Sequence, residues 1–231
     1  MKTLRGLLFD KDGTLFDFQA TWGGWAADLL LDLAADDPVQ ADALAARLRL
    51  DRHARRYHPD SVAVAGTTEH VVRALLPLLP DQSFSVLYER IVAESQKIEA
   101  IEAVPLVPLL DRLRAEGFVL GVATNDEAAA AAAQLRGCGV LQLFDFVAGA
   151  DSGHGAKPGP GQCLAFAEAT GIDPARVAMI GDSIFDLSAG AAAGMVPVGV
   201  LTGPATEAEL APFAAAILPD IGHLPGWLGL G

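Results

Sequence analysis

Short apolar runs rich in valine, isoleucine, leucine and phenylalanine alternate along most of this chain with stretches of helix-forming composition. Runs of this length without polar alternation are typical of strands buried on both faces. We expect strands at 6–9, 118–124, 146–149, 177–181, 197–201 and 215–218. Helices are expected between them, at 107–116, 127–137, 160–170, 184–193 and 206–212. The alternation predicts an α/β fold with a doubly wound parallel sheet.

The alternation stops between about residue 17 and about residue 103, where the pattern is helical throughout. Helices are expected near 22–35, 38–53, 68–79 and 83–100. We therefore predict an inserted all-helical cap domain at 17–103, with 1–16 and 104–231 forming the core. An insertion at this point would lie above the carboxyl ends of the strands, where open α/β sheets bind ligands.

Composition narrows the classes of function. The chain has 231 residues and a formal net charge of −13, which disfavours binding to nucleic acid or to anionic membranes. No stretch of about 18 apolar residues predicts a membrane span, and the apolar stretch near the N-terminus is short for a signal peptide. Cys138 and Cys163 lie far apart, which favours reduced, buried thiols. We expect a cytoplasmic enzyme, monomeric or homodimeric, with no nucleic-acid or membrane partner.

Polar residues follow the expected strands at the points where those strands end. Because parallel strands end at one edge of a sheet, these residues are expected to converge there. A glycine after two alternating carboxylates would let the backbone turn sharply. The residues are Asp10, Asp12, Gly13, Thr124, Asn125, Lys157, Asp182 and Asp186.

This set suits phosphoryl transfer, in which catalysis consists mainly of positioning and charge neutralisation. Asp10 and Asp182 are the natural carboxylate ligands for Mg²⁺. A carboxylate nucleophile at Asp10 would form an aspartyl-phosphate, and Asp12 is placed to act as general acid and base. Lys157 would offset repulsion between phosphate and carboxylates, and Thr124 would donate a hydrogen bond to a phosphoryl oxygen.

The chain resembles the haloacid dehalogenase-like (HAD) hydrolase superfamily, and within it the phosphoglycolate phosphatase-like branch with a helical cap. Four motifs occur in the family's order: Phe-Asp-Lys-Asp-Gly-Thr-Leu at 9–15, Thr124, Lys157-Pro158, and Gly181-Asp182 with Asp186. The stretch 144–151 also looks like this branch. The resemblance implies a Rossmann-like core, Mg²⁺ as cofactor and a small phosphorylated metabolite as substrate.

The resemblance also implies a role for each matching residue. Asp10 would be nucleophile and metal ligand, and Asp12 would be the acid/base that also binds the metal through its backbone carbonyl. Asp182 would complete the metal ligands. Three roles are open to Asp186: a direct or water-mediated ligand, a partner that orients Lys157, or an acid in the first turn of a helix. The substrate-binding candidates are Thr124, Asn125, Lys157 and Gly13.

Two departures from the branch weaken assignment to phosphoglycolate: Gly159-Pro160-Gly161 after the motif lysine, and Phe18 where relatives have a small hydroxyl residue. The same core also supports a sugar-phosphate mutase. A dehalogenase would lack Asp12, and a phosphonate hydrolase would need a lysine early in the cap. A non-catalytic signalling module would place its phospho-acceptor on a later strand.

An arginine-rich segment at 47–56 lies in the expected insert. On one helix, Arg49, Arg52 and Arg56 would share a face that could meet an anionic substrate tail. The alternative, which we favour, is a solvated face paired with surface acids. The five histidines show no metal-ligand spacing, and no role is assigned to them.

Overall fold

The computed structural model describes residues 3–230. Residues 1, 2 and 231 of the expected core range lie outside the described residues. Within the described part, six strands form one parallel sheet in the order β5-β4-β1-β6-β7-β8. The strands are β1 (Gly6–Phe9), β4 (Val119–Ala123), β5 (Phe146–Ala148), β6 (Val177–Gly181), β7 (Val196–Val200) and β8 (Ala216–Leu218). Each lies within one residue of its predicted bounds, so the expected sheet is confirmed.

The sheet is covered on both faces, as the apolar strands require. Leu7 and Phe9 of β1 contribute to one hydrophobic cluster, together with leucines of the helix at Leu106–Ala115. Leu8 points to the opposite face, where it joins a second cluster with Phe166. This period-two alternation along a fully buried strand is the geometry of a doubly wound sheet.

Five core helices lie at the predicted positions: α6 (Leu106–Ala115), α7 (Ala128–Gly137), α8 (Gly161–Thr170), α9 (Ile184–Ala192) and α10 (Glu207–Leu210). The structure adds elements that were not predicted: α11 (Leu224–Trp227) and the 3-10 turns η2 (Leu141–Leu143), η3 (Pro174–Arg176) and η4 (Ile221–His223). The cap of α7 differs from the expected Asn125 or Asp126: its N-cap is Glu127, and the amide of Ala128 donates to Asp151 Oδ1 at 2.9 Å.

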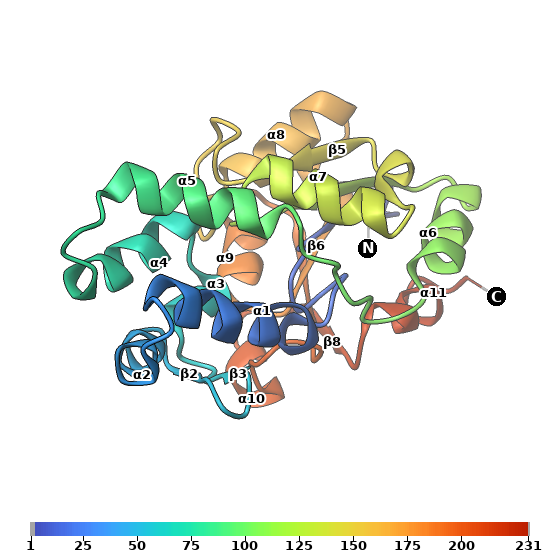
Figure 1. Ribbon diagram of the computed structural model, residues 1–231. Helices are drawn as coiled ribbons and strands as arrows, with labels where there is room; N and C mark the ends of the chain where they lie inside the picture. Colours follow the sequence, from blue (N-terminus) through green and yellow to red (C-terminus); the bar gives the residue numbers. More distant parts are fainter. Residues whose placement is uncertain (1–2, 231) are drawn as a thin grey trace.

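The helical insert, α1 to α5, packs around its own apolar cluster, whose buried members lie between Phe18 and Ile91. Its helices are α1 (Phe18–Leu33), α2 (Pro38–Arg47), α3 (Val62–Ala65), α4 (Thr68–Leu75) and α5 (Phe84–Ser95), with the 3-10 turn η1 (Leu76–Leu78). Figure 1 shows α1, α2, α4 and α5 gathered on one side of the molecule, away from α6 and α11. This cluster is separate from the two clusters that cover the sheet.

The insert departs from the all-helical prediction in one place. The expected helix 38–53 ends at Arg47, and the chain then forms a two-stranded antiparallel sheet of β2 (Leu50–Asp51) and β3 (Arg56–Tyr57). Arg49 takes a left-handed φ of 51°, which ends the helical path. The turn places Leu50 and Tyr57 in the insert's apolar cluster.

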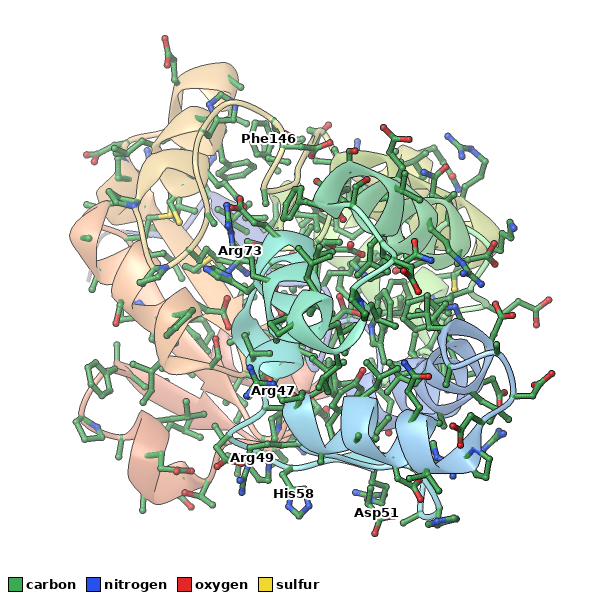
Figure 2. The ribbon with its side chains drawn as sticks, turned by 60° about the vertical axis from the view of Figure 1, so that its left-hand side comes forward. Arg47, Arg49, Asp51, His58, Arg73 and Phe146 are labelled. Carbon is green, nitrogen blue, oxygen red and sulfur yellow. The ribbon has the colours of Figure 1, made fainter. Side chains whose placement is uncertain are left out.

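The arginine-rich segment therefore has no continuous helical face. Arg49 pairs with Asp60 at 2.6 Å and Arg52 with Asp42 at 2.7 Å, while Arg55 pairs with Asp28. Figure 2 shows Arg49 and the nearby His58 at the outer edge of the insert. The predicted pairing with surface acids is confirmed for these three arginines, of which Arg49 and Arg55 are exposed and Arg52 is half-buried.

Candidate active site

Three neighbouring strands, β4, β1 and β6, deliver the predicted residues to one edge of the sheet. Asp10 follows β1, Thr124 follows β4 and Asp182 follows β6. The amide of Asp10 continues the sheet by donating to Ile180 O at 2.8 Å. These three side chains are more than nine-tenths buried, so each is held in a defined position.

Lys157 reaches this edge from the loop between β5 and α8. Its Nζ donates to Asp10 Oδ1 at 2.5 Å, to Asp186 Oδ1 at 2.6 Å and to Ala123 O at 2.8 Å, which uses all three protons of the ammonium group. Burial alone would lower the pKa of Lys157, but Asp10 and Asp186 raise it above its ordinary value. Lys157 is therefore a permanent cation beside Asp10.

Asp182 lies in a space that two glycines keep open. A Cβ on Gly13, whose φ is 83°, would stand 2.4 Å from Asp182 Oδ2, and a Cβ on Gly203 would stand 1.7 Å from the same atom. Both distances are far inside van der Waals contact. Gly13 also donates its N–H to Phe16 O and accepts from Thr202 Oγ1, so its backbone is fixed in a turn.

Asp186 combines two of the roles considered for it. Its Oδ2 accepts from the N–H and the hydroxyl of Ser183 at 3.0 and 2.6 Å, which forms a capping box at the start of α9. Its Oδ1 accepts from Lys157. Asp186 therefore caps a helix and orients the lysine with the same carboxylate.

The carboxylates of Asp10, Asp182 and Asp186 have oxygens within 4.8 Å of one another. Burial raises the pKa of Asp10 to about 7; Lys157 opposes the rise, while Asp186 and Asp12 add to it. Burial, and then the charges of Asp10 and Asp186, raise the pKa of Asp182 well above its ordinary value. When all three carboxylates are ionised, the ammonium group of Lys157 neutralises one of their three charges. This donor set fits a hard divalent cation.

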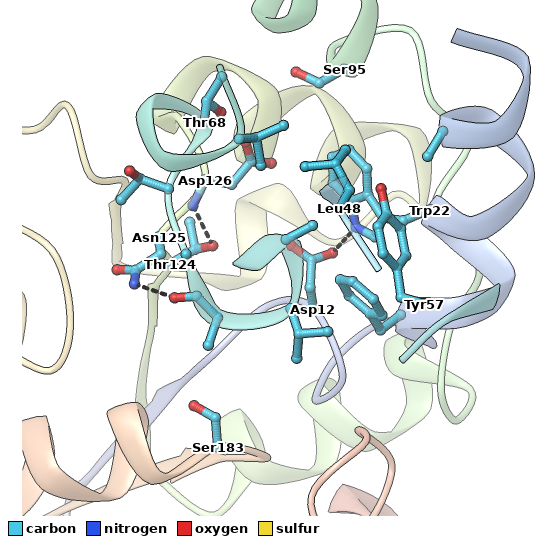
Figure 3. A pocket seen from close by; sticks show the side chains of 18 of the residues that line it. Asp12, Trp22, Leu48, Tyr57, Thr68, Ser95, Thr124, Asn125, Asp126 and Ser183 are labelled. Carbon is cyan, nitrogen blue, oxygen red and sulfur yellow. Dashed lines mark hydrogen bonds between the residues drawn. The ribbon is translucent and has the colours of Figure 1, made fainter. Parts of the chain in front are cut away.

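Asp12 lines the same cavity and is held by two side chains outside this cluster. Lys11 Nζ lies 2.6 Å from Asp12 Oδ2, and the indole N–H of Trp22 donates to Asp12 Oδ1 at 2.7 Å. Trp22 belongs to α1 of the insert, so the carboxylate of Asp12 joins the two parts of the chain. The Trp22–Asp12 bond is one of the dashed lines in Figure 3.

Lys11 was assigned no role from the sequence, yet it is fully buried. Besides Asp12 its ammonium group contacts Gln134 Oε1 at 2.5 Å and Asp126 Oδ2 at 3.2 Å. Burial alone would lower the pKa of Lys11, but the charges of Asp12 and Asp126 raise it. The sequence signal that could have identified Lys11 is its position between Asp10 and Asp12, directly after an apolar strand.

Thr124 and Asn125 differ in whether their side chains still have a hydrogen-bond donor available for a substrate. Thr124 Oγ1 accepts from the Asp126 N–H at 3.1 Å, which leaves the hydroxyl proton for another acceptor. The Asn125 amide donates to Ala65 O and Lys157 O, each at 2.9 Å, and accepts from the Lys157 N–H at 2.8 Å. Both N–H bonds of Asn125 therefore position the lysine loop and the insert; substrate binding by Asn125 stays a prediction.

Glu127 forms a third hydrogen-bonded contact between the core and the insert. It is 4% exposed and accepts from Thr68 Oγ1 at 2.7 Å and from Tyr88 Oη at 2.8 Å. Sequence reasoning did not single out this residue. Together with the Trp22 and Asn125 contacts, it holds the insert over the carboxylates.

A cavity of about 110 Å³ lies beneath the insert. Its lining includes all the carboxylates of the site as well as Thr124 and Lys157. Figure 3 shows Asp12 and Thr124 among the lining residues. Aromatic and aliphatic side chains of α1 and α4 complete it. The convergence of polar groups on one concave site marks it as the candidate active site.

The remaining polar candidates lie elsewhere. Cys163 is buried, and burial raises the pKa of its thiol to about 12, whereas Cys138 is half-buried instead of fully buried as expected.

Across residues 3–230 every helix is too short or too polar to cross a membrane.

Comparisons with known proteins agree with this geometry. The family model of haloacid dehalogenase-like hydrolases matches residues 4–194. The chain is 29% identical over 214 residues to the protein named "Probable phosphatase IndB" of Dickeya dadantii, covering 93% of this chain and 88% of that one. It is 31% identical over 201 residues to the phosphoglycolate phosphatase of Caulobacter vibrioides, covering 87% and 81%.

Solved structures show the same fold. A HAD family hydrolase from Deinococcus radiodurans R1 with bound phosphate and sodium has a TM-score of 0.69 and 26% identity, covering 100% of this chain and 98% of that one. A haloacid dehalogenase-like hydrolase from Bacteroides fragilis has a TM-score of 0.73 and 22% identity, covering 96% and 100%. With a family model matching most of its length, this chain belongs to the haloacid dehalogenase-like hydrolases.

Proposed function

We propose that this enzyme is a magnesium-dependent phosphatase that hydrolyses a small phosphate monoester through a phosphoaspartate on Asp10. The observation that carries the proposal is the buried group of Asp10, Asp182 and Asp186 beside Lys157, in which the carboxylates outnumber the ammonium group. Relatives named as phosphatases over most of the chain's length support the same reaction.

The residues act in two steps. A carboxylate oxygen of Asp10 attacks phosphorus while the ester P–O bond breaks, and protonated Asp12 gives its proton to the leaving oxygen. Asp12 then takes a proton from water, the water oxygen attacks phosphorus, and the Asp10–phosphorus bond breaks to release orthophosphate. The Thr124 hydroxyl donates to a phosphoryl oxygen, and the charge of Lys157 offsets the repulsion between phosphate and the carboxylates.

Asp10, Asp182 and Asp186 would hold Mg²⁺, with the backbone carbonyl of Asp12 as a further ligand. The ion supplies neutralisation of charge on the phosphoryl oxygens in the transition state. We further propose that the cap is the segment 17–103, and that the enzyme works in the cytoplasm as a monomer or homodimer.

Asp10→Asn tests the nucleophile. We expect phosphate release from phenyl phosphate with Mg²⁺ to fall by roughly 10⁴-fold or more, because nucleophile replacements have losses of this order. The control is Asp111→Asn, which changes an exposed carboxylate on α6 and should leave turnover unchanged. Unchanged activity in Asp10→Asn would exclude Asp10 as nucleophile.

The reaction products distinguish the proposed phosphatase from a sugar-phosphate mutase and from a signalling module. A sugar-phosphate mutase would return an isomeric phosphate ester with little orthophosphate. A signalling module would accumulate a stable phosphoaspartate without turnover. The proposal requires stoichiometric orthophosphate and regenerated enzyme.

A further inference from the structure

The cavity has two dissimilar surfaces. Its floor is formed by the core loops that carry the aspartates and Lys157. Its roof, the part contributed by α1 to α5, is mainly aromatic and aliphatic. We define the roof by Trp22, Trp25, Leu29, Leu48, Tyr57 and Val71, all of which line the cavity. Substrate atoms beyond the phosphoryl group must lie against the roof, because the floor is occupied by the reacting groups.

The roof offers no positive charge. Among residues 3–230, Lys157 is the one basic side chain that lines the cavity, and its three protons are already bonded to the floor. Arg49 and Arg52 of the insert pair with acids outside the cavity. A carboxylate on the leaving group would therefore be removed from water without a cationic partner, which is strongly unfavourable.

The polar group that the roof leaves without a partner is neutral. Tyr57 is 7% exposed and lines the cavity, and its Oη has no hydrogen-bond partner within residues 3–230. Figure 3 shows its side chain extending among the lining residues, near Leu48 and Trp22. Burial raises the pKa of this phenol, so it stays a hydrogen-bond donor. By contrast, the hydroxyls of Thr68 and Ser95 already donate to Glu127 and to Val92 O.

The roof also adjoins the proton donor. Trp22, which forms part of the apolar wall, donates directly to Asp12. Trp22 and Trp25 pack edge to face with ring centroids 5.2 Å apart, so the wall is stiff. A leaving group against this wall would have its ester oxygen near Asp12. The cavity has a volume of about 110 Å³, which favours a small leaving group.

We propose that the substrate is a phosphate monoester whose leaving group is small, uncharged and mainly apolar, such as a single ring or a short branched chain. This inference rests on the proposed function. It distinguishes this chain from an enzyme for 2-phosphoglycolate, whose leaving group carries a carboxylate.

The test compares kcat/KM for phenyl phosphate, 4-carboxyphenyl phosphate and 2-phosphoglycolate with Mg²⁺. We expect phenyl phosphate to exceed each carboxylate ester by roughly 10²-fold or more, in line with the cost of an unpaired buried charge. Equal or higher values for the carboxylate esters would overturn the inference while leaving the phosphatase function intact. Hydrolysis of none of the three, together with no other phosphate ester, would overturn the proposed function itself.

A charge placed in the roof gives an independent check. In Val71→Lys, the preference for phenyl phosphate over 4-carboxyphenyl phosphate should fall by roughly 10-fold or more, because the new ammonium group would pair with the carboxylate. Val39→Lys is the matched control: Val39 is 77% exposed on α2, and this variant should keep the original preference. If both variants keep it while folded by circular dichroism, the roof does not select the leaving group.

Discussion

The floor of the cavity brings three carboxylates and an ammonium group within a few ångströms of one another, whereas the roof presents indole, phenol and aliphatic surface. The floor depends on the ends of three adjacent strands, and the sheet fixes their spacing. The roof depends on the packing of short helices around a separate apolar cluster. In the proposed function, the floor therefore determines the type of reaction and the roof determines the choice of substrate. The floor depends on the sheet, whereas the roof depends on the packing of the insert.

The largest effect should come from the floor. Asp12→Asn removes the proton donor, and we expect kcat/KM for an alkyl phosphate to fall by roughly 10²–10⁴-fold. The loss for 4-nitrophenyl phosphate should be much smaller, because its leaving group needs no proton. Steady-state kinetics on both esters checks this. Equal losses on the two would assign Asp12 a structural role only.

Lys11→Met should have the largest effect on stability. The change leaves the mostly buried carboxylates of Asp12 and Asp126 without the fully buried cation that they share, and breaking a buried pair costs about 3–5 kcal/mol. Urea denaturation measures the free energy of unfolding. Lys97→Met is the control, since Lys97 is 68% exposed and pairs only with Glu94 on the surface. Similar stabilities for the two variants would contradict the buried network.

A smaller effect is expected from Gly203→Ala. The added Cβ would collide with Asp182 Oδ2 and displace a proposed metal ligand. Changes beside a metal ligand lower metal affinity by roughly 10–100-fold, and a magnesium titration of activity should show this. Gly226→Ala, where a Cβ meets nothing within 4 Å, should have the Mg²⁺ dependence of the parent enzyme.

The smallest effect is expected on the outer surface of the insert. Arg49→Ala breaks an exposed pair with Asp60, and such pairs contribute about 0–1 kcal/mol. We expect kcat/KM to be unchanged for every ester. A selective loss on carboxylate esters would instead mean that the arginine-rich segment reaches the substrate, and the distinction between an acid-rich floor and an uncharged roof would fail.

The sequence predicts the floor far better than the roof. Gly6–Phe9 and Val177–Gly181 are recognisable because fully buried parallel strands are continuous apolar runs, and the site residues follow directly from where the strands end. Tyr57 could not be placed, because the predicted helix 38–53 concealed the turn that follows Arg47. That turn is stabilised by tertiary burial, which local composition does not encode.

The buried lysine network escaped prediction for a related reason. A lysine in a sequence is normally a solvated residue, and its burial at Lys11 depends on Asp126 and Gln134, more than a hundred positions away. Asp186 shows the opposite case. An acid in the first turn of a helix and a partner that orients Lys157 are alternative predictions for this residue, and the structure joins both in one side chain.

The joint at Asn125 has a consequence for how the enzyme could change its substrate. Its three side-chain hydrogen bonds within residues 3–230 all go to main-chain atoms, of Ala65 and Lys157, so this contact does not depend on which side chains the insert carries. Substitutions in the roof can therefore accumulate while this attachment to the core persists. New specificities are accessible by exchanging side chains on an unchanged attachment, without rebuilding the reaction centre beneath it.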